Sequence, residues 1–515
     1  MGLVGPNGCG KSTLLRLIQG ELKSDTGFVS RRKGLTIGYL PQDPLLGPGH
    51  TLWQEILSAS TELARIEGEL ARVEAQLADP EVYGNEKTLT RTLARQQRLV
   101  EEYEELGGPG YEGRVRSVLH SLGFGESDLR LPVEALSGGQ KKLAGLAKLL
   151  VTEPNLLLLD EPDNHLDLEG KAFLERFIRG YEGSVVIVSH DRYMLDLIVD
   201  EIVELEDGRL THYPGNYSEY AFEKRMRLLR QQQLYQIQRR EITRLEQSAQ
   251  RLMVWGIKNS KFVRRAQNIM KRIERMDKID RPVLVRRRMG LELEGWRGSN
   301  KVLEIEGLGK AFPDEDGQMT ILKGLDLLIW RGERVGIVGP NGAGKSLLFR
   351  LILGQEEPSS GVIKVGPSVE IGYYAQEHET LDYDRTLIDT VRQAAALSEQ
   401  AAIAFLRRFI FSYEQARELV GDLSGGERSR LQMALLMLSR ANFLLLDEPT
   451  NNLDIPSAEV LEDALAEFEG TVLVISHDRY FLDRVVTRIA ELDGSSLTEY
   501  VGGYSDYREA RVETA

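Results

Sequence analysis

The chain has 515 residues, of which 42% are hydrophobic and 28% charged, and its formal net charge is −14. This length allows two or more domains, and the apolar runs are far shorter than the roughly 20 residues of a membrane-spanning helix. Because no secretory leader is visible and the single cysteine excludes an internal disulfide and a cysteine-rich metal or iron–sulfur site, we expect a cytoplasmic protein without membrane insertion.

The chain contains an internal repeat. "GLVGPNGCGKSTLLRLI" at 2–18 matches "GIVGPNGAGKSLLFRLI" at 336–352, an offset of 334 residues. "LSGGQ" at 136–140 matches "LSGGE" at 423–427, where the offset has fallen to 287. The first copy therefore holds 47 extra residues, around 60–108.

The first copy begins abruptly within a predicted strand. Met1 aligns with Val335, and about 35 strand-rich residues precede that point in the second copy. A buried central strand shortened in this way would leave apolar surface uncovered. We therefore expect the native first domain to begin upstream of Met1.

Both copies contain the pattern GxxxxGK[ST] between a predicted strand and a predicted helix. Such a loop lets backbone N–H groups surround phosphates at a helix N-terminus. Lys11 and Lys345 would reach the β- and γ-phosphates, and the hydroxyls of Ser12 and Ser346 would bind Mg²⁺. The predicted ATP-binding residues of the two loops are Gly5, Pro6, Asn7, Gly8, Cys9, Gly10, Lys11, Ser12, Thr13, Gly339, Pro340, Asn341, Gly342, Ala343, Gly344, Lys345, Ser346 and Leu347.

Adjacent acidic residues end the apolar runs "NLLLLDE" and "NFLLLDE". The runs are typical of buried parallel strands. Asp160 and Asp447 would hold Mg²⁺ through water, and Glu161 and Glu448 would polarise the attacking water. Alone, two acids at this position could simply end a strand, but the phosphate loop upstream favours catalysis. Asp163 replaces the Thr450 of the second copy and adds negative charge near the first catalytic acid, so we expect unequal sites.

The segments "LSGGQ" and "LSGGE" have two interpretations. Ser137 and Ser424 could be ordinary N-caps of the helices that follow. The same segments resemble the signature of ATP-binding-cassette (ABC) ATPases. Gln42 and Gln376 are similar to the Q-loop of that family, "NHLD" and "NNLD" to its D-loop, and His190 and His477 to its switch histidine.

The resemblance implies an α/β fold with two tandem ABC-type P-loop NTPase domains, at 1–221 and 301–515, which pair head to tail within a monomer. ATP would lie between the phosphate loop of one domain and the signature of the other. Phe312 is similar to the adenine-stacking aromatic of the family, although a core phenylalanine is the alternative. The signature residues implied in ATP binding are Ser137, Gly138, Gly139, Gln140, Ser424, Gly425, Gly426 and Glu427. The implied Mg²⁺ ligands are Ser12, Gln42, Asp160, Ser346, Gln376 and Asp447, and the implied catalytic residues are Glu161, Glu448, His190 and His477.

The extra residues at 60–108 predict a helical-hairpin arm. Leu63, Ile66, Leu70, Val73 and Leu77 follow heptad spacing in the first half of this segment. After "ADPEVYGNE", a similar seam is predicted through Leu89, Leu93, Val100 and Tyr103.

The segment 222–300 predicts a basic helical linker between the domains. Residues 222–290 contain 20 Lys and Arg against 6 Asp and Glu, a local net charge of +14. Helical spacing runs through Ala266, Ile269, Ile273, Met276 and Ile279, and Leu234 to Leu252 predict a preceding helix. Aromatic and cationic residues alternate between these helices, a pattern that suits RNA because bases stack and phosphates need positive charge. The alternative is a solvated charged hairpin that binds no RNA. The predicted RNA contacts are Trp255, Lys258, Lys261, Phe262, Arg264 and Arg265.

Tandem cassettes with such an arm and linker resemble the ABC-F family of translation factors. The resemblance implies an ATPase that binds the ribosome at its tRNA exit site, with the linker toward the peptidyl-tRNA and the peptidyl-transferase centre and the arm toward the ribosomal stalk. The implied partners of the linker and arm are rRNA and tRNA. A fused ATPase subunit of a membrane importer is the alternative, but it predicts a short linker without a basic aromatic tip. A DNA-maintenance ATPase is disfavoured, because the zinc-binding cysteines and very long coiled coils are missing.

Overall fold

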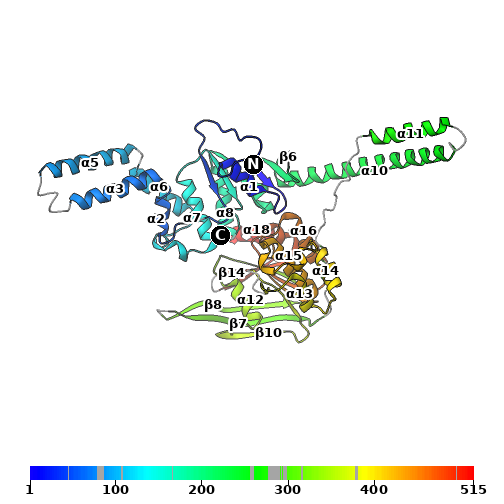
Figure 1. Ribbon diagram of the computed structural model, residues 1–515. Coiled ribbons are helices and arrows are strands. Elements are labelled where there is room, and N and C mark those ends of the chain that lie inside the picture. The colour runs from blue at the N-terminus through cyan, green and yellow to red at the C-terminus, as the bar shows by residue number, and fades with distance from the viewer. Residues whose placement is uncertain are drawn as a thin grey trace.

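The computed structural model describes residues 1–515 apart from 45, 78–85, 106–107, 165, 256–259, 277–289, 292, 294–297, 315–316, 377–380, 494–495 and 515. Two cassettes lie against each other, and helical projections extend from them in opposite directions (Figure 1). The prediction of an α/β protein with two cassettes is confirmed. None of the helices in these ranges combines the length and the apolar composition needed to cross a lipid bilayer.

The first cassette is built around a six-stranded sheet in the order β2-β3-β4-β1-β5-β6. All neighbouring strands are parallel except β6, which runs antiparallel to β5. The strands are β1 (Gly2–Val4), β2 (Ile37–Leu40), β3 (Leu156–Asp160), β4 (Ser184–Val188), β5 (Glu201–Glu206) and β6 (Arg209–Pro214). The helices are α1 (Lys11–Gln19), α2 (Leu52–Leu57), α3 (Thr61–Leu77), α5 (Glu86–Glu105), α6 (Gly108–Ser121), α7 (Gly138–Leu150), α8 (Leu168–Gly180) and α9 (Arg192–Ile198).

The second cassette repeats this sheet as β11-β12-β13-β9-β14-β15 and adds a three-stranded sheet, β10-β7-β8. The strands are β7 (Lys301–Asp314), β8 (Gly317–Trp330), β9 (Arg334–Val338), β10 (Ser360–Val365), β11 (Ile371–Tyr374), β12 (Phe443–Asp447), β13 (Thr471–Ile475), β14 (Arg488–Asp493) and β15 (Ser496–Val501). The helices are α12 (Lys345–Ile352), α13 (Leu387–Ala394), α14 (Glu399–Arg408), α15 (Gly425–Leu438), α16 (Ile455–Glu467), α17 (Arg479–Val485) and α18 (Tyr504–Thr514).

The apolar runs form the central strands because both faces of each parallel sheet are covered, and in the second cassette one face packs against helices and the other against α12 and the three-stranded sheet. Leu157, Leu158 and Leu159 of β3 are fully buried, and every residue of β12 is buried as well. Since parallel strands end at one edge of a sheet, the segments that follow β1, β3 and β4 meet there. This edge holds the phosphate loop, the acidic pair and the switch histidine of each cassette.

The arm is a hairpin of α3 and α5 that projects from the first cassette (Figure 1). Its small core consists of Ile66, Val73 and Leu99. On the second helix the predicted seam is wrong at Leu93 and Val100, which are 45% and 38% exposed, whereas Tyr103 packs against the core as predicted. The cause is that Leu99 and Val100 are adjacent apolar residues, and spacing alone could not decide which of them faces α3.

The linker begins with α10 (Tyr217–Trp255), a continuous helix that crosses the predicted boundary at 221. It packs against α11 (Ser260–Glu274) to form the basic hairpin, which points away from the cassettes on the side opposite the arm (Figure 1). Ala249 and Ala266 are buried within this pair. Their small side chains let the two helices approach closely. Of the predicted helical positions, Met276 lies beyond the end of α11, and Ile279 lies outside the described residues.

Candidate active site

The first phosphate loop lies between β1 and α1, as predicted. Lys11 donates to the carbonyl oxygens of Gly5 and Pro6 at 2.9 and 3.2 Å, so its ammonium lies across the loop. Gly10 has φ 101°, a left-handed conformation that favours glycine and aims the following N–H groups into the loop. The loop can therefore present a cation and backbone donors to a phosphate.

The second phosphate loop repeats this geometry between β9 and α12. Lys345 donates to the carbonyl oxygens of Gly339 and Pro340 at 2.9 and 2.8 Å, and Gly344 has φ 91°. Burial lowers the pKa of Lys345, and the carboxylate of Glu448 opposes this effect.

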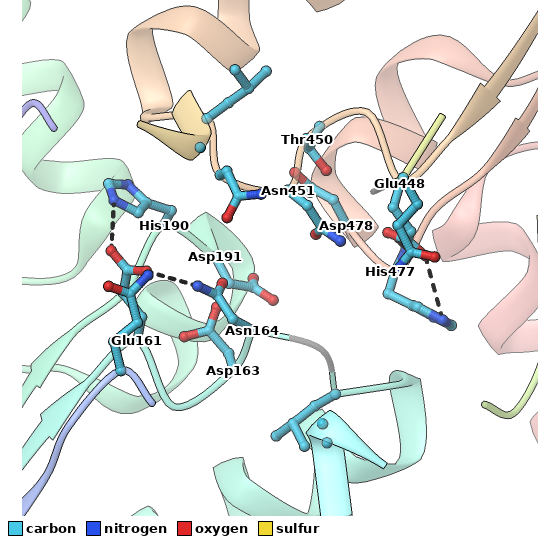
Figure 2. A pocket seen from close by; sticks show the side chains of 18 of the residues that line it. Glu161, Asp163, Asn164, His190, Asp191, Glu448, Thr450, Asn451, His477 and Asp478 are labelled. Atoms are coloured by element: carbon cyan, nitrogen blue, oxygen red, sulfur yellow. Dashed lines mark hydrogen bonds and ion pairs between the residues drawn. The ribbon is translucent and has the colours of Figure 1, made fainter. Parts of the chain in front are cut away.

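The first acidic pair ends β3, and its glutamate is held by three side chains. Gln42 and Asn164 donate to one carboxylate oxygen of Glu161 at 2.8 and 2.7 Å. His190 Nε2 lies 3.4 Å from the other oxygen (Figure 2). Burial raises the pKa of Glu161, but the hydrogen bond from His190 and the charges of His190 and Lys11 outweigh it and lower the pKa overall.

The second acidic pair ends β12, and its glutamate has a different environment. Glu448 accepts a hydrogen bond from the backbone N–H of His477 at 3.3 Å, and the two side chains lie 3.5 Å apart (Figure 2). Burial and the neighbouring Asp447 raise the pKa of Glu448 to about 8. Both Glu161 and Glu448 have positive φ values, 50° and 49°, a strained conformation that is typical of functional sites. The two sites are therefore alike in backbone geometry and unequal in electrostatics.

The buried aspartates of the two pairs have an environment that suits Mg²⁺. Burial raises the pKa of Asp160, and the Ser12 hydroxyl, which hydrogen-bonds it, opposes that shift. Asp447 is 1% exposed at the equivalent position beside Ser346. A buried carboxylate next to a hydroxyl offers the oxygen ligands that Mg²⁺ prefers.

The N-cap interpretation of the signature segments is confirmed, and it is compatible with their role in ATP binding, which stays a prediction. Ser137 is the N-cap of α7 and Ser424 that of α15, and each forms a reciprocal capping box with Gln140 or Glu427. The capping fixes the first turn of each helix, whose N–H groups then face the cleft between the cassettes.

The signature of the second cassette lies across from the first phosphate loop. The Asn7 side chain donates to the carbonyl of Asn452 at 3.2 Å, and its backbone N–H donates to Asp454 at 3.3 Å. A Cβ on Gly426 would lie 3.3 Å from the Asn7 amide. On the opposite side, the backbone N–H of Asn341 donates to Asp167 at 3.1 Å. The cassettes therefore pair head to tail.

A single cleft of about 1090 Å³ holds both sites. The predicted residues that line it are Asn7, Gly8, Gly10, Lys11, Ser12, Thr13, Gln42, Ser137, Gly138, Gly139, Glu161, His190, Asn341, Gly342, Gly344, Lys345, Ser346, Leu347, Gln376, Ser424, Gly425, Gly426, Glu427, Asp447, Glu448 and His477. Phe312 is not among the lining residues. It lies on β7 with the Lys310 ammonium 4.9 Å from its ring, and its adenine-stacking role stays a prediction.

Buried ion pairs across the interface were missed by the sequence reasoning. Arg192 pairs with Glu462, and Arg479 pairs with Glu175. These residues are equivalent across the repeat at the 287-residue offset, which is the signal that could have identified them. Because such pairs are buried only when the cassettes meet, they favour one relative orientation.

The predicted RNA-contact residues lie near the tip of the basic hairpin. Lys261, Arg264 and Arg265 are exposed on α11, and Phe262 of the same helix is half-buried. Trp255 ends α10, but its side chain is not described, and Lys258 lies outside the described residues. Their role in RNA binding stays a prediction.

Comparisons with known proteins agree with this geometry. A family model described as ABC transporter matches residues 1–164 and 322–451, and a second with the same description matches 203–292. The chain is 40% identical to YdiF of Bacillus subtilis, over 99% of this chain and 78% of that protein. It is 36% identical to the energy-dependent translational throttle protein EttA of Escherichia coli K12, over 100% of this chain and 91% of that protein.

The fold is also found in solved structures. The archaeal ribosome recycling factor aABCE1, solved with the ribosomal stalk protein aP1, matches with a TM-score of 0.59 and 20% identity, over 99% of this chain and 87% of that chain. The RNase-L Inhibitor matches with a TM-score of 0.57 and 19% identity, over 99% of this chain and 88% of that chain. At such identities the likeness shows the fold alone. With its relatives at 36–40% identity along the whole length, the chain belongs to the ABC-F family of ATP-binding-cassette proteins and hydrolyses ATP.

Proposed function

We propose that the chain is a cytoplasmic, monomeric translation factor whose cassettes close on two ATP molecules and thereby fix the basic hairpin on the ribosome, at the tRNA exit site. Each ATP contacts the phosphate loop of one cassette and the signature of the other. The head-to-tail contacts of Asn7 and Asn341 support this arrangement. Closure is then favoured by ATP and lost after hydrolysis.

Hydrolysis at each site uses the glutamate that ends the acidic strand. Glu161 and Glu448 orient and polarise the attacking water, and His190 and His477 contact these glutamates from the next strand. Lys11 and Lys345 place positive charge near the β- and γ-phosphates. The serine, glutamine and aspartate of each site would hold Mg²⁺, which would neutralise charge on the phosphates. The six proposed ligands are Ser12, Gln42, Asp160, Ser346, Gln376 and Asp447.

The observation that carries the proposal is a continuous connection from the cassette interface to the hairpin. Helix α9 begins with Arg192, which pairs with Glu462 of the other cassette. Four residues later, Asp196 accepts hydrogen bonds from the backbone N–H and the hydroxyl of Ser218, at 2.6 and 2.7 Å. Ser218 lies in the first turn of α10, which runs without interruption to the hairpin tip. Closure of the cassettes can therefore set the direction of the hairpin.

The charge of the hairpin supports RNA as its partner. Residues 222–290 carry a local net charge of +14 in a chain whose total is −14. A basic projection on an acidic protein favours one polyanionic contact, and ribosomal RNA and tRNA are polyanions. The name of EttA, which describes a translational throttle, agrees with a role in translation.

Sedimentation of cell extracts tests this proposal. In the Glu161→Gln/Glu448→Gln double variant, ATP should bind without being hydrolysed, so the protein should accumulate in ribosome fractions when ATP is present. The same variant with Arg264→Glu and Arg265→Glu should move to the top of the gradient. Association of the double variant with membranes, or equal ribosome binding after the charge reversals, contradicts the proposal.

A further inference from the structure

Lys171 is a buried cation at the cassette interface that neither the motifs nor the repeat explains. It lies on α8 of the first cassette and is 7% exposed. Its ammonium lies 3.0 Å from Asp191 and also donates to the backbone carbonyl of His477, in the other cassette, at 2.9 Å. A buried lysine therefore connects the first cassette to the switch histidine of the second.

The repeat places no lysine at the equivalent position of the second cassette. At the 287-residue offset, Lys171 aligns with Ala458, and Asp163 aligns with Thr450. Asp163 is 4% exposed and lies close enough to Lys171 and Asp191 for its charge to act on both (Figure 2). The second cassette thus has no charged residue at the positions equivalent to Asp163 and Lys171. An equivalent contact to the carbonyl of His190 cannot form from an alanine.

Asp163 lines the same cleft as Glu161, and its charge also acts on the buried pair of Lys171 and Asp191. Asp163 faces the interface with Lys171 and Asp191, whereas Glu161 is held by Gln42 and Asn164. Lys171 balances this group of acids together with Arg479, which donates to Asp191 at 3.3 Å. Removing Lys171 alone would leave Asp163 and Asp191 repelling each other in a buried place.

The two catalytic glutamates depend on the opposite cassette to different extents. Glu161 accepts from two amide side chains of its own cassette. Among the described residues, the backbone donor to Glu448 is the N–H of His477, whose carbonyl oxygen accepts from Lys171. Lys171 of the first cassette thus fixes the position of His477, which in turn donates a hydrogen bond to Glu448.

From this geometry we infer that Lys171 is a positioning residue for the second ATP site, which makes hydrolysis there depend on closure more strongly than hydrolysis at the first site. Lys171 contacts His477 only when the cassettes meet, so Glu448 is correctly placed only in the closed state. The inference rests on the assignment of the ATP sites in the proposed function, and it does not depend on ribosome binding.

Photolabelling of both sites in one molecule tests the inference. The full chain, with a protease site placed at 281–289, is mixed with azido-ATP labelled at the α- or the γ-phosphate, irradiated during a single turnover, and cleaved between the cassettes. The α-label on each cassette measures binding, and the ratio of γ- to α-label measures the nucleotide not yet hydrolysed. In Lys171→Met, hydrolysis at the second cassette should slow about tenfold while its α-label and the first cassette stay unchanged.

A second variant excludes a failure of folding. Asp163→Thr/Lys171→Ala gives the first cassette the residues of the second and leaves no unbalanced buried charge, and it should show the same selective slowing with thermal unfolding close to wild type. Equal slowing at both cassettes, or none at either, overturns the inference. Glu448→Gln tests the site assignment itself, because it must stop hydrolysis at the second cassette. If it does not, the proposed function fails instead.

Discussion

The first glycine of the second phosphate loop occupies a position where a side chain does not fit. Gly339 has φ +151°, and a Cβ there would lie 2.1 Å from the carbonyl oxygen of Leu492, a backbone atom of β14 that cannot move aside easily. We predict that Gly339→Ala lowers the free energy of unfolding by about 1–3 kcal/mol and weakens ATP binding at this loop. Urea unfolding and titration with a fluorescent ATP analogue measure the two effects.

The control for this change is Gly113→Ala in α6. A Cβ at Gly113 meets nothing within 4 Å, and alanine favours a helix, so this variant should be neutral or slightly stabilising. If both variants lose the same stability, the close approach to Leu492 does not constrain Gly339.

At this scale, sequence reasoning could identify residues whose chemistry depends on local spacing. Motif spacing predicts Lys11 and Glu161, and the resemblance to ABC ATPases predicts His190. Each of the three follows a strand that ends at the same edge of the parallel sheet. Lys171 could not be predicted, because its partner His477 is 306 residues away and in the other cassette. The extra charge of Asp163 can be read from the repeat, but its position close to Lys171 and Asp191 cannot, since sequence does not give the direction of a side chain after a turn.

At the scale of the elements, the first turns of α10 and α18 are fixed by the same kind of serine–aspartate contact, but the basic hairpin is built on α10. Ser218 binds Asp196, and at the equivalent positions Ser505 donates to Asp483 from its backbone N–H and its hydroxyl, both at 2.7 Å. We predict that Asp196→Ala weakens ribosome binding of the hydrolysis-deficient protein about tenfold, because the first turn of α10 is no longer fixed to α9. The matched Asp483→Ala should have no such effect, since the basic hairpin is built on α10 and not on α18. Pelleting with purified ribosomes compares them, and equal losses contradict the anchor.

The arm offers a comparison of neighbouring residues on one helix. Leu99 is 6% exposed in the α3–α5 core, whereas Val100 is 38% exposed. We predict that Leu99→Ala destabilises the arm by about 2–4 kcal/mol and that Val100→Ala changes it by less than about 0.5 kcal/mol. Hydrogen exchange of 61–77 and 86–105 measures the arm alone. Faster exchange in Val100→Ala than in Leu99→Ala would restore the seam predicted from heptad spacing.

At the scale of the whole molecule, the interface between the cassettes contains two ion pairs at equivalent positions of the repeat. The glutamates of the two pairs differ in the arginines that lie beside them. Glu462 pairs with Arg192 and also with Arg484 of its own cassette at 2.8 Å. The buried Glu175 pairs with one arginine among the described residues, Arg479. Removing Arg479 therefore leaves a buried carboxylate without its cation in the closed state, whereas removing Arg192 leaves Glu462 with Arg484. The two halves of the interface should thus tolerate the same substitution differently.

We predict that Arg479→Ala weakens ATP-driven closure of the hydrolysis-deficient protein by about 3 kcal/mol, on the order of a hundredfold in the ATP concentration required, and that Arg192→Ala weakens it much less. Small-angle scattering during an ATP titration follows the closure. Glu175→Gln added to Arg479→Ala should restore part of it, because a neutral amide costs less to bury than a lone carboxylate. If Arg192→Ala is the more damaging change, Arg484 does not compensate for the loss of Arg192 beside Glu462. If Glu175→Gln brings no recovery, the lone carboxylate of Glu175 is not the cause of the loss.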